Sequence, residues 1–375
     1  AIPHNSNLSG GRMFEIVDSE GRPISAEYAR TRMRWEPLVE VLQIKGTSET
    51  HPFLSPEDEF ADFELGYQRD GNIIHTRGDM TAPDPADYVR TALLRGLRVE
   101  EEAGVNPYKF GLQGATDTHT TLSDTDEDLF AGWLANYAGP ANGPGALPVF
   151  GRVETWNSAA QGITGAWSTA NTREALTAAF KRKEVYATSG PRIQLRMFGG
   201  FEFETEDANA RDIAAVGYGG GVPMGGDLAQ APSDTPVSLL IHAVKDSVGA
   251  NLDRVQVIKG WLDEEGETHE RVYDVAWAGQ RTAVNGKVPP IGSTVDVARA
   301  TYDNTIGSAE LSTVWVDPDF DPDERAFYYV RVLEIPTPRY STYDAVALGL
   351  DPAQFTGQPA AIQERAFSSP IWYTP

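Results

Sequence analysis

An aspartate and a histidine two positions apart are the residues of this chain best suited to chemistry. Asp117 and His119 follow residues 109–114, a short segment with the pattern of a strand. In extended backbone, side chains at positions i and i+2 point to the same side, so this carboxylate and imidazole would project together from the strand's end. Carboxylate and neutral imidazole are ligands that zinc, manganese and iron accept. The pair predicts a divalent-metal site, but a D-x-H triplet is common and needs other donors beside it.

Three further segments place ionisable side chains within or just after apolar runs. His4 opens a polar loop, and Glu40 lies inside the run PLVEVLQI. A carboxylate in a buried strand is costly unless a metal or another cation compensates it. If that strand alternates regularly, Gln43 points to the face opposite Glu40. Glu49 and His51 follow the same strand after a short loop and form a third group of this kind.

Alternating helix and strand patterns have to position these residues. Residues 84–103 carry apolar side chains at helical spacing and are followed by Gly104, a natural helix end. A second helix is predicted over residues 172–183, with a capping box that starts at Asn171 and basic residues in the last turn. A third is predicted over residues 123–137. This alternation predicts an α/β layer or barrel for the first half of the chain.

The pattern changes after about residue 195. Helical periodicity nearly disappears, and strand-like runs recur at residues 236–244, 254–261, 271–277, 326–335 and 366–373. Residues 263–266 separate two of these runs in the manner of a hairpin turn. We therefore predict an α/β domain over residues 1–198 and a β-sandwich over residues 199–375.

Composition excludes several classes of function. The 375 residues include 31 basic and 54 acidic side chains, and a formal net charge of −23 repels nucleic acid and anionic membrane surfaces. With no cysteine, thiolate catalysis and cysteine-bound metals are excluded. No apolar run approaches the ~20 residues of a membrane helix. The hydrated acidic surface favours an extracytoplasmic protein, periplasmic or secreted.

Three motifs in a fixed order carry a resemblance to a known family. IPHN, LVEVLQIKG and GATDTHT are similar to the last third of the polymerase-and-histidinol-phosphatase (PHP) metallohydrolase domain. The stretches SNLSGGRMF, TREALTAAFKRKEVYATSGPRI and RAFSSPIWY resemble a bacterial group, domain of unknown function 3604, related to carbaryl-hydrolase-like metallohydrolases. The resemblance covers nearly the whole chain. It implies the C-terminal part of a PHP-like, distorted TIM-type α/β barrel, followed by the β-sandwich.

The resemblance also implies roles for particular residues. His4, Asp117 and His119 match three metal ligands of the PHP pattern, and Glu40 matches the acid of the intervening strand. A PHP site normally begins with an H-x-H strand, which this sequence does not supply. We therefore expect residue 1 to follow a cleavage boundary, and a separate N-terminal fragment of the same protein to carry the H-x-H half of the site. A complete site would hold two or three divalent ions, zinc, manganese or iron.

The function that follows from the resemblance is metal-dependent hydrolysis. Metal ions lower the pKa of a bound water and polarise a phosphoryl or carbonyl oxygen of a small-molecule ester. His51, from its position alone, is the predicted acid for the leaving group, with Glu40 as a second catalytic residue. Phosphoesters are the first expected substrates, and carboxyl esters, carbamates or amides the alternative. A non-enzymatic binding or scaffold protein with a relic site is the remaining alternative.

Overall fold

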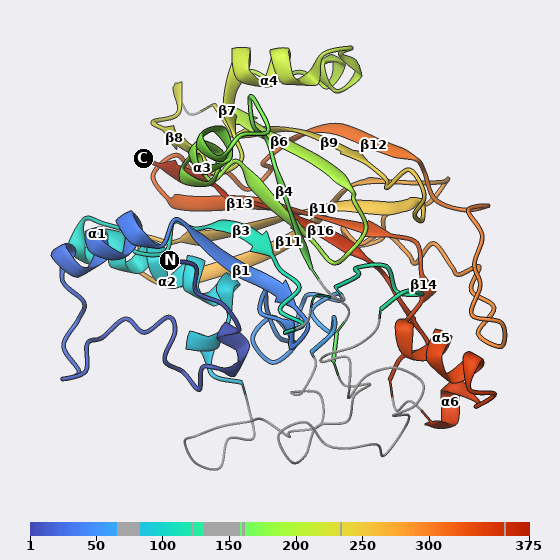
Figure 1. Cartoon of the computed structure of the whole chain (residues 1–375). Coiled ribbons are helices and arrows are strands. Elements are labelled where there is room, and N and C mark those ends of the chain that lie inside the picture. Colours follow the sequence, from blue (N-terminus) through green and yellow to red (C-terminus); the bar gives the residue numbers. More distant parts are fainter. Residues whose placement is uncertain are drawn as a thin grey trace.

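The structure is a computed structural model of the chain, drawn in Figure 1, and it describes residues 1–65, 83–119, 121, 123–130, 158–159, 162–232, 235–355 and 358–375. The helices are α1 (Ala26–Trp35), α2 (Val89–Ala103), α3 (Arg173–Arg182), α4 (Ile213–Gly220), α5 (Tyr340–Ala347) and α6 (Pro352–Phe355). The strands of the first two hundred residues are β1 (Leu38–Gln43), β2 (Gly46–Thr47), β3 (Gly111–Gly114), β4 (Ile163–Ala166), β5 (Val185–Thr188) and β6 (Gln194–Gly200). The later strands are β7 (Gly221–Pro223), β8 (Asp227–Ala229), β9 (Ser238–Val244), β10 (Leu252–Leu262), β11 (Thr268–Trp277), β12 (Glu310–Val316), β13 (Arg325–Glu334), β14 (Thr337–Pro338), β15 (Ala361–Ile362), β16 (Arg365–Ser368) and β17 (Ile371–Thr374).

The helices of the first half begin and end where local chemistry dictates. In α2, the apolar face predicted from the sequence is buried, and the chain leaves the helix at Gly104 in the left-handed conformation (φ 71°) that glycine adopts without strain. In α3, the side chain of Thr172, and not the predicted Asn171, accepts the capping hydrogen bond from the backbone of Ala175. Both helix predictions are confirmed to within a few residues.

The structure describes only the first part of the predicted helix over residues 123–137. Residues 123–130 form bends and a turn and no helix, while residues 131–137 lie outside the described part of the chain. A cluster of four aspartates and glutamates in 124–128 explains the turn, since Asp124 accepts a hydrogen bond from the backbone of Asp126 and competes with helical bonding.

A large sheet forms the centre of the molecule. Its strand order is β11-β10-β13-β16-β5-β4, with β17 also paired to β13 and β8 paired to β17. Alternate side chains of β10 enter different cores: Val255 and Val257 pack in one, Ile258 and Leu262 in the other. The sheet is therefore buried on both faces, which explains why β13 reads as a continuous apolar run from Ala326 to Val330 in the sequence.

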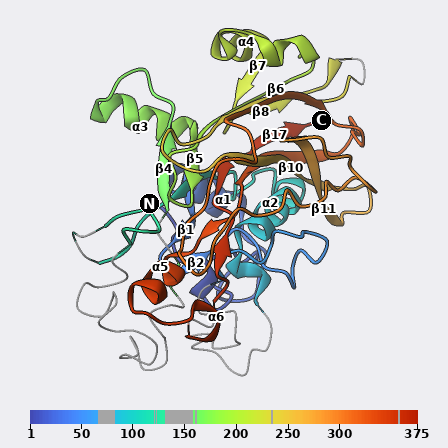
Figure 2. The same cartoon turned by 90° about the vertical axis from the view of Figure 1, so that its right-hand side faces the viewer.

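Two smaller sheets cover the two faces of the large one. The four-stranded sheet, in the order β12-β9-β6-β7, packs on one face through the core that contains Leu195 and Ile241. The three-stranded sheet, in the order β2-β1-β3, packs with α2 on the other face through the core that contains Val39 and Leu112. Figure 2 shows this layering, with α4 and β7 at the top and β1 and β2 below the large sheet. A two-stranded sheet, β14-β15, completes the pairing.

The predicted barrel is wrong. A TIM-type barrel requires parallel strands each followed by a helix, whereas the described strands form open sheets in which most pairs are antiparallel. Among these described strands only β1 with β3, and β17 with β8, pair in parallel. The succession of helix and strand patterns in the sequence is genuine, but it does not specify pairing direction. The fold is β-rich.

The predicted domain boundary at residue 198 stays a prediction. Strand β6 runs across that position, and β4 and β5 from the first half join the same large sheet as β10 and β13 from the second half. The later strand runs and the 263–266 turn appear in the structure, with Asp263 donating its backbone N–H to Glu267 at 3.0 Å.

A cluster of buried ion pairs ties the first half to the large sheet; we call it the arginine cluster. Arg331 on β13 binds Asp58 through two bonds of 2.6 and 2.9 Å, and Arg90 on α2 binds the same carboxylate at 2.8 Å. Glu49 accepts from Arg90 and from the Tyr329 hydroxyl. The two guanidinium groups outweigh the effect of burial and hold the pKa of Asp58 well below its ordinary value.

Gly114 lets the small sheet approach the large one closely. A Cβ at this position would lie 2.8 Å from the carbonyl oxygen of Ile163 and 3.2 Å from that of Thr188. Both are backbone atoms of the large sheet, so they cannot move aside as a flexible side chain would. The C-terminal end of β3 is thereby seated against β4 and β5.

Candidate functional site

The carboxyl ends of β1 and β3 meet at one edge of the small sheet. The two strands are parallel, with Leu42 opposite Gly114. The first residues of the chain lie along the same edge, because Glu40 donates its backbone N–H to the carbonyl of Pro3 at 3.0 Å and the Asn7 side chain donates to the carbonyl of Lys45 at 3.1 Å. Three segments that are far apart in the sequence therefore converge there; we call this place the rim.

An irregularity in β1 brings Gln43 to the same face as Glu40. The register with β3 shifts between Glu40 and Leu42, as at a β-bulge, so strict alternation is interrupted. Gln43 donates one hydrogen bond to Asp117 at 2.8 Å and another to Asn5, and it also hydrogen bonds to Glu40. Regular alternation, the condition under which Gln43 would face away from Glu40, is therefore not met in β1.

Asp117 is the most connected acid of the rim. Its Oδ2 accepts from Gln43 and forms an ion pair with the Lys45 ammonium group, and its Oδ1 lies 3.1 Å from Nε2 of His119. Burial alone would raise the pKa of Asp117, but the hydrogen bonds and attraction from Lys45, together with His119 and Gln43, lower it. Asp117 is therefore a carboxylate at neutral pH.

Glu40 lies beside the same group of charges but is much more buried. Only 4% of it is exposed, and its Oε1 accepts from the backbone N–H of Asn5 at 3.1 Å. Burial raises the pKa of Glu40, and the negative charge of Asp117 adds to that effect, while Asn5 and the nearby His4 oppose it. The rim thus pairs an ionised aspartate with a glutamate that holds its proton to higher pH.

The backbone of the rim is strained at three places. Asn5 (φ 50°), Asp117 (φ 47°) and His119 (φ 57°) all adopt the left-handed conformation that residues with a Cβ rarely take. Such conformations cost on the order of 1–3 kcal/mol each and gather at functional sites, where the surrounding structure holds them. Two of these three residues, Asp117 and His119, are candidate metal ligands from the sequence.

His51 and Glu49 lie in different surroundings. The ring of His51 stacks on Phe53 and meets the edge of Tyr88, with centroid distances of 5.3 and 5.8 Å, and burial lowers its pKa. Glu49 belongs to the arginine cluster. The structure brings His4, Glu40, Asp117 and His119 to the rim, but the contacts of His51 are with other residues.

The chemistry of the rim suits a divalent ion, but the ligand set is incomplete. Two histidines and two carboxylates are donors that zinc and manganese accept. Within the described ranges, however, no three histidine, aspartate or glutamate side chains are close enough together to hold a metal ion. The positive charge that pairs with Asp117 is the ammonium group of Lys45.

Sequence reasoning missed three polar residues of the rim: Asn5, Gln43 and Lys45. Lys45 is 8% exposed. The sequence signal that could have been used is a lysine directly after the apolar run PLVEVLQI. Asn is among the few residue types that tolerate the left-handed conformation, so the IPHN motif also contained a turn signal. Gln43 gave no usable signal, because the bulge that turns it is not visible in the residue pattern.

A comparison with protein families assigns the chain. The family described as "Protein of unknown function (DUF3604)" matches residues 1–375. The chain belongs to this family. A comparison with curated proteins finds no significant match. Among the residues that the structure describes, no helix has the length and apolar character needed to cross a membrane.

Proposed function

We propose that this protein is a metal-dependent hydrolase of small esters, with phosphoesters as the preferred class, and that the rim forms part of its active site. The observation that carries the proposal is the meeting of His4, Glu40, Asp117 and His119 from three separate segments. The left-handed backbone at Asp117 and His119 supports it, because strain of this kind persists where a structure fixes side-chain placement. The likeness of the three motifs to PHP metallohydrolases supports the choice of reaction.

The charges of the rim favour an anionic ester. Lys45 places an ammonium group next to Asp117 at the edge where the strands end. An ammonium group attracts a phosphoryl oxygen more strongly than the neutral carbonyl of a carboxyl ester. Asp117 balances this ammonium charge, so the divalent ions that the site would hold supply the rest of the attraction against the net charge of −23. Phosphoesters therefore rank above carboxyl esters and carbamates.

Each rim residue has a defined task in this proposal. A bound divalent ion would supply an acidic water and a Lewis acid. Asp117 stays ionised and, with His4 and His119, offers donors to that ion. Glu40 is the residue suited to hold and pass on a proton, since burial raises its pKa toward the working range. Gln43 orients Asp117 and Asn5 through its amide group.

The remaining ligands come from elsewhere in this proposal. We propose that a polypeptide carrying an H-x-H pair, as the PHP pattern implies, completes the ion site beside the rim. His51 stays outside the catalytic set, because its ring packs against Phe53 and Tyr88. The size of the complete ion cluster, two or three ions by the same resemblance, depends on that partner.

The test combines metal analysis with turnover. The protein, with everything that copurifies identified by intact mass, is loaded with Mn²⁺ or Zn²⁺ and assayed with p-nitrophenyl phosphate, bis-p-nitrophenyl phosphate and p-nitrophenyl acetate. We expect phosphoester turnover, a loss of at least about tenfold in metal affinity for Asp117→Ala, and no change for Asp323→Ala in an exposed turn. Turnover of the acetate alone would reverse the ranking of substrates. Unchanged metal content in Asp117→Ala would exclude the rim as the metal site and favour a binding or scaffold protein.

A further inference from the structure

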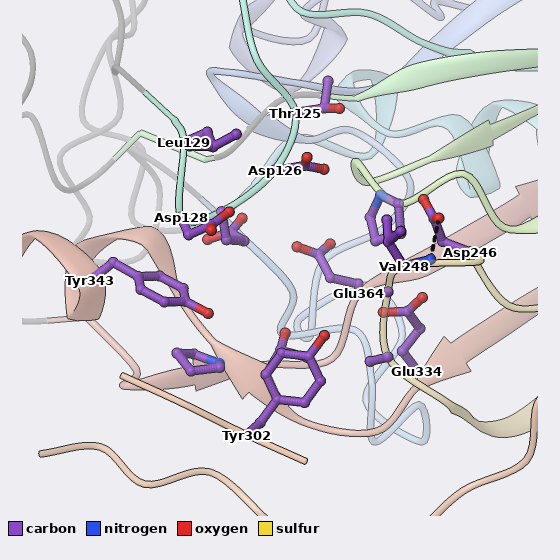
Figure 3. Close-up of a pocket in the computed structure, with 16 residues that line it drawn as sticks. Thr125, Asp126, Asp128, Leu129, Asp246, Val248, Tyr302, Glu334, Tyr343 and Glu364 are labelled. Atoms are coloured by element: carbon purple, nitrogen blue, oxygen red, sulfur yellow. Dashed lines mark hydrogen bonds between the residues drawn. The ribbon is translucent and has the colours of Figure 1, made fainter. Parts of the chain in front are cut away.

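A cavity of about 320 Å³ separate from the rim is lined by six carboxylates; we call it the acidic pocket. It lies between the loop that follows β9, the end of β13 and the start of α5, and Figure 3 shows its lining. The acids are Asp126, Glu127, Asp128, Asp246, Glu334 and Glu364. None of the rim residues lines it.

Two of these acids are almost completely buried, yet each presents an unbonded oxygen. Glu334 and Glu364 are 1% and 3% exposed, and both carboxyl groups are directed into the cavity in Figure 3. Among the described residues, Oε1 of each has no hydrogen-bond donor while these acids are ionised. A buried carboxylate oxygen without a donor carries a large desolvation cost, so the pocket contains polar groups that its own fold leaves unsatisfied.

Three of the six acids, all glutamates, also lie close to one another. The backbone N–H of Glu334 donates to the carbonyl of Glu364 at 2.8 Å, which makes the two acids cross-strand neighbours. Glu127 joins them, and a hydrogen bond between its carboxyl group and that of Glu364 exists only while one of the two holds a proton. Burial raises the pKa of all three, that of Glu364 to about 8. Repulsion adds to this effect, from Glu364 on Glu127, from Glu334 on Glu364 and from Asp246 on Glu334.

The cations around the pocket have other bonds. Lys245 donates to the carbonyls of Asp246 and Gly249 at 2.9 and 2.8 Å. Arg339 binds both oxygens of Glu64 at 2.7 and 2.8 Å. Arg192 attracts Asp126 and gives its backbone N–H to Asp246 at 2.7 Å. Asp246 is thus satisfied, whereas the buried glutamates are not.

The shape and walls of the pocket favour an organic cation over a metal ion. Tyr302 and Tyr343 present aromatic rings beside the acids, and Pro191, Pro338 and Val248 add apolar surface. Aromatic faces attract ammonium groups. The acids are spread around the cavity, and no three of them, within the described ranges, are gathered as a metal requires. A ligand with separated charges on an apolar chain matches that arrangement.

We propose that the acidic pocket binds a small aliphatic diamine or triamine, with one ammonium group at Glu334 and Glu364 and another near Asp126 and Asp128. The carbon chain lies against the tyrosine and proline walls. Binding converts protonated Glu364 to its carboxylate and releases a proton, because the ammonium group replaces that proton as the partner of the buried oxygens. This site is independent of hydrolysis at the rim.

Isothermal titration calorimetry with 1,4-diaminobutane tests the proposal. The titration is run at pH 7 and about 150 mM NaCl, where non-specific attraction to the net negative charge is screened, in two buffers of different ionisation enthalpy. We expect saturable binding of one diamine per chain and a heat that changes with the buffer, which reports the released proton. 1,4-Butanediol, of the same length and uncharged, gives no binding.

Variants separate the pocket from the rest of the acidic surface. Glu334→Gln with Glu364→Gln is expected to lower the affinity for 1,4-diaminobutane at least about tenfold, while Glu265→Gln in the exposed hairpin turn leaves it unchanged. If the double variant does not fold, Asp126→Asn with Asp128→Asn is expected to lower the affinity about threefold or more. The proposal is overturned by the absence of saturable diamine binding, by equal affinities in the pocket and control variants, or by binding of Ca²⁺ or Mn²⁺ that the diamine does not displace.

Discussion

The arginine cluster and the acidic pocket both bury carboxylates, but they satisfy them in opposite ways. In the arginine cluster, Asp58 faces two guanidinium groups, and its pKa is lowered despite burial. In the acidic pocket, Glu334 and Glu364 face other acids, and their pKa values are raised. A buried acid with a cation from its own chain serves the architecture. A buried acid without one needs a proton or a cation from outside, and that difference marks the pocket as a binding site.

The largest expected effect comes from removing one arginine of the cluster. Arg331→Met leaves Asp58 as a buried charge with only part of its partners, so we expect the free energy of unfolding to fall by about 3–5 kcal/mol. Urea denaturation followed by circular dichroism measures it. The matched control is Arg271→Met, which breaks an exposed pair with Asp319 and should cost less than about 1 kcal/mol. Equal losses in the two variants would contradict a stabilising role for the cluster.

The next effect is the pH dependence that the acidic pocket imposes. In the folded protein Glu364 keeps its proton up to about pH 8, whereas in the unfolded chain it releases the proton near its ordinary value of 4.5. Its contribution to stability is therefore complete below pH 4.5 and is lost as the pH rises toward 8. Glu364→Gln does not titrate, so we expect its stability at pH 8 to exceed that of the unmodified protein by about 1–3 kcal/mol.

Urea midpoints measured between pH 5 and pH 8 check this prediction. The two curves should meet near pH 5 and separate as the pH increases. Parallel curves would mean that Glu364 is not the titrating group. The arginine cluster behaves in the opposite sense, since the lowered pKa of Asp58 makes its contribution disappear only as the pH falls below the ordinary value of 3.8.

The smallest expected effect comes from removing one hydrogen bond to Glu364. The hydroxyl of Ser189 donates to Oε2 of Glu364 and so lowers the pKa of that acid. Ser189→Ala removes the donor and raises the pKa of Glu364 in the folded protein further, so we expect the decline in stability to continue to higher pH, with a change at pH 7 of about 1 kcal/mol or less. The same urea series measures it, with the exposed Ser293→Ala as the control. A shift to lower pH would contradict the assigned direction of the bond.

The sequence predicted local features of the fold better than its global arrangement. The end of α2 at Gly104 and the strand runs of the second half depend on neighbouring residues, and these predictions were confirmed. The barrel prediction failed because strand direction depends on which segments pair, for example β4 with β5 in antiparallel register. Residue spacing along the chain contains no information on that pairing.

The rim and the acidic pocket also differ in how far the sequence predicted them. His4, Glu40, Asp117 and His119 stood out because each follows or interrupts an apolar run, and the structure places them at one rim. The acidic pocket did not stand out, because Glu127, Glu334 and Glu364 are separated by up to more than two hundred positions and each looks like an ordinary surface acid in its own segment. Only the tertiary fold shows that they are buried together.

The absence of a side chain at Gly114 has a consequence for how the rim can move. Where β3 ends at Gly114, its backbone approaches backbone atoms of Ile163 and Thr188 so closely that no side chain fits between the small sheet and the large one at this point. Asp117 follows three residues later, so the chain that leads to it is packed at Gly114 against β4 and β5. We therefore expect a rearrangement that substrate or metal induces at the rim to displace the segment that contains His4 more than the chain at Gly114.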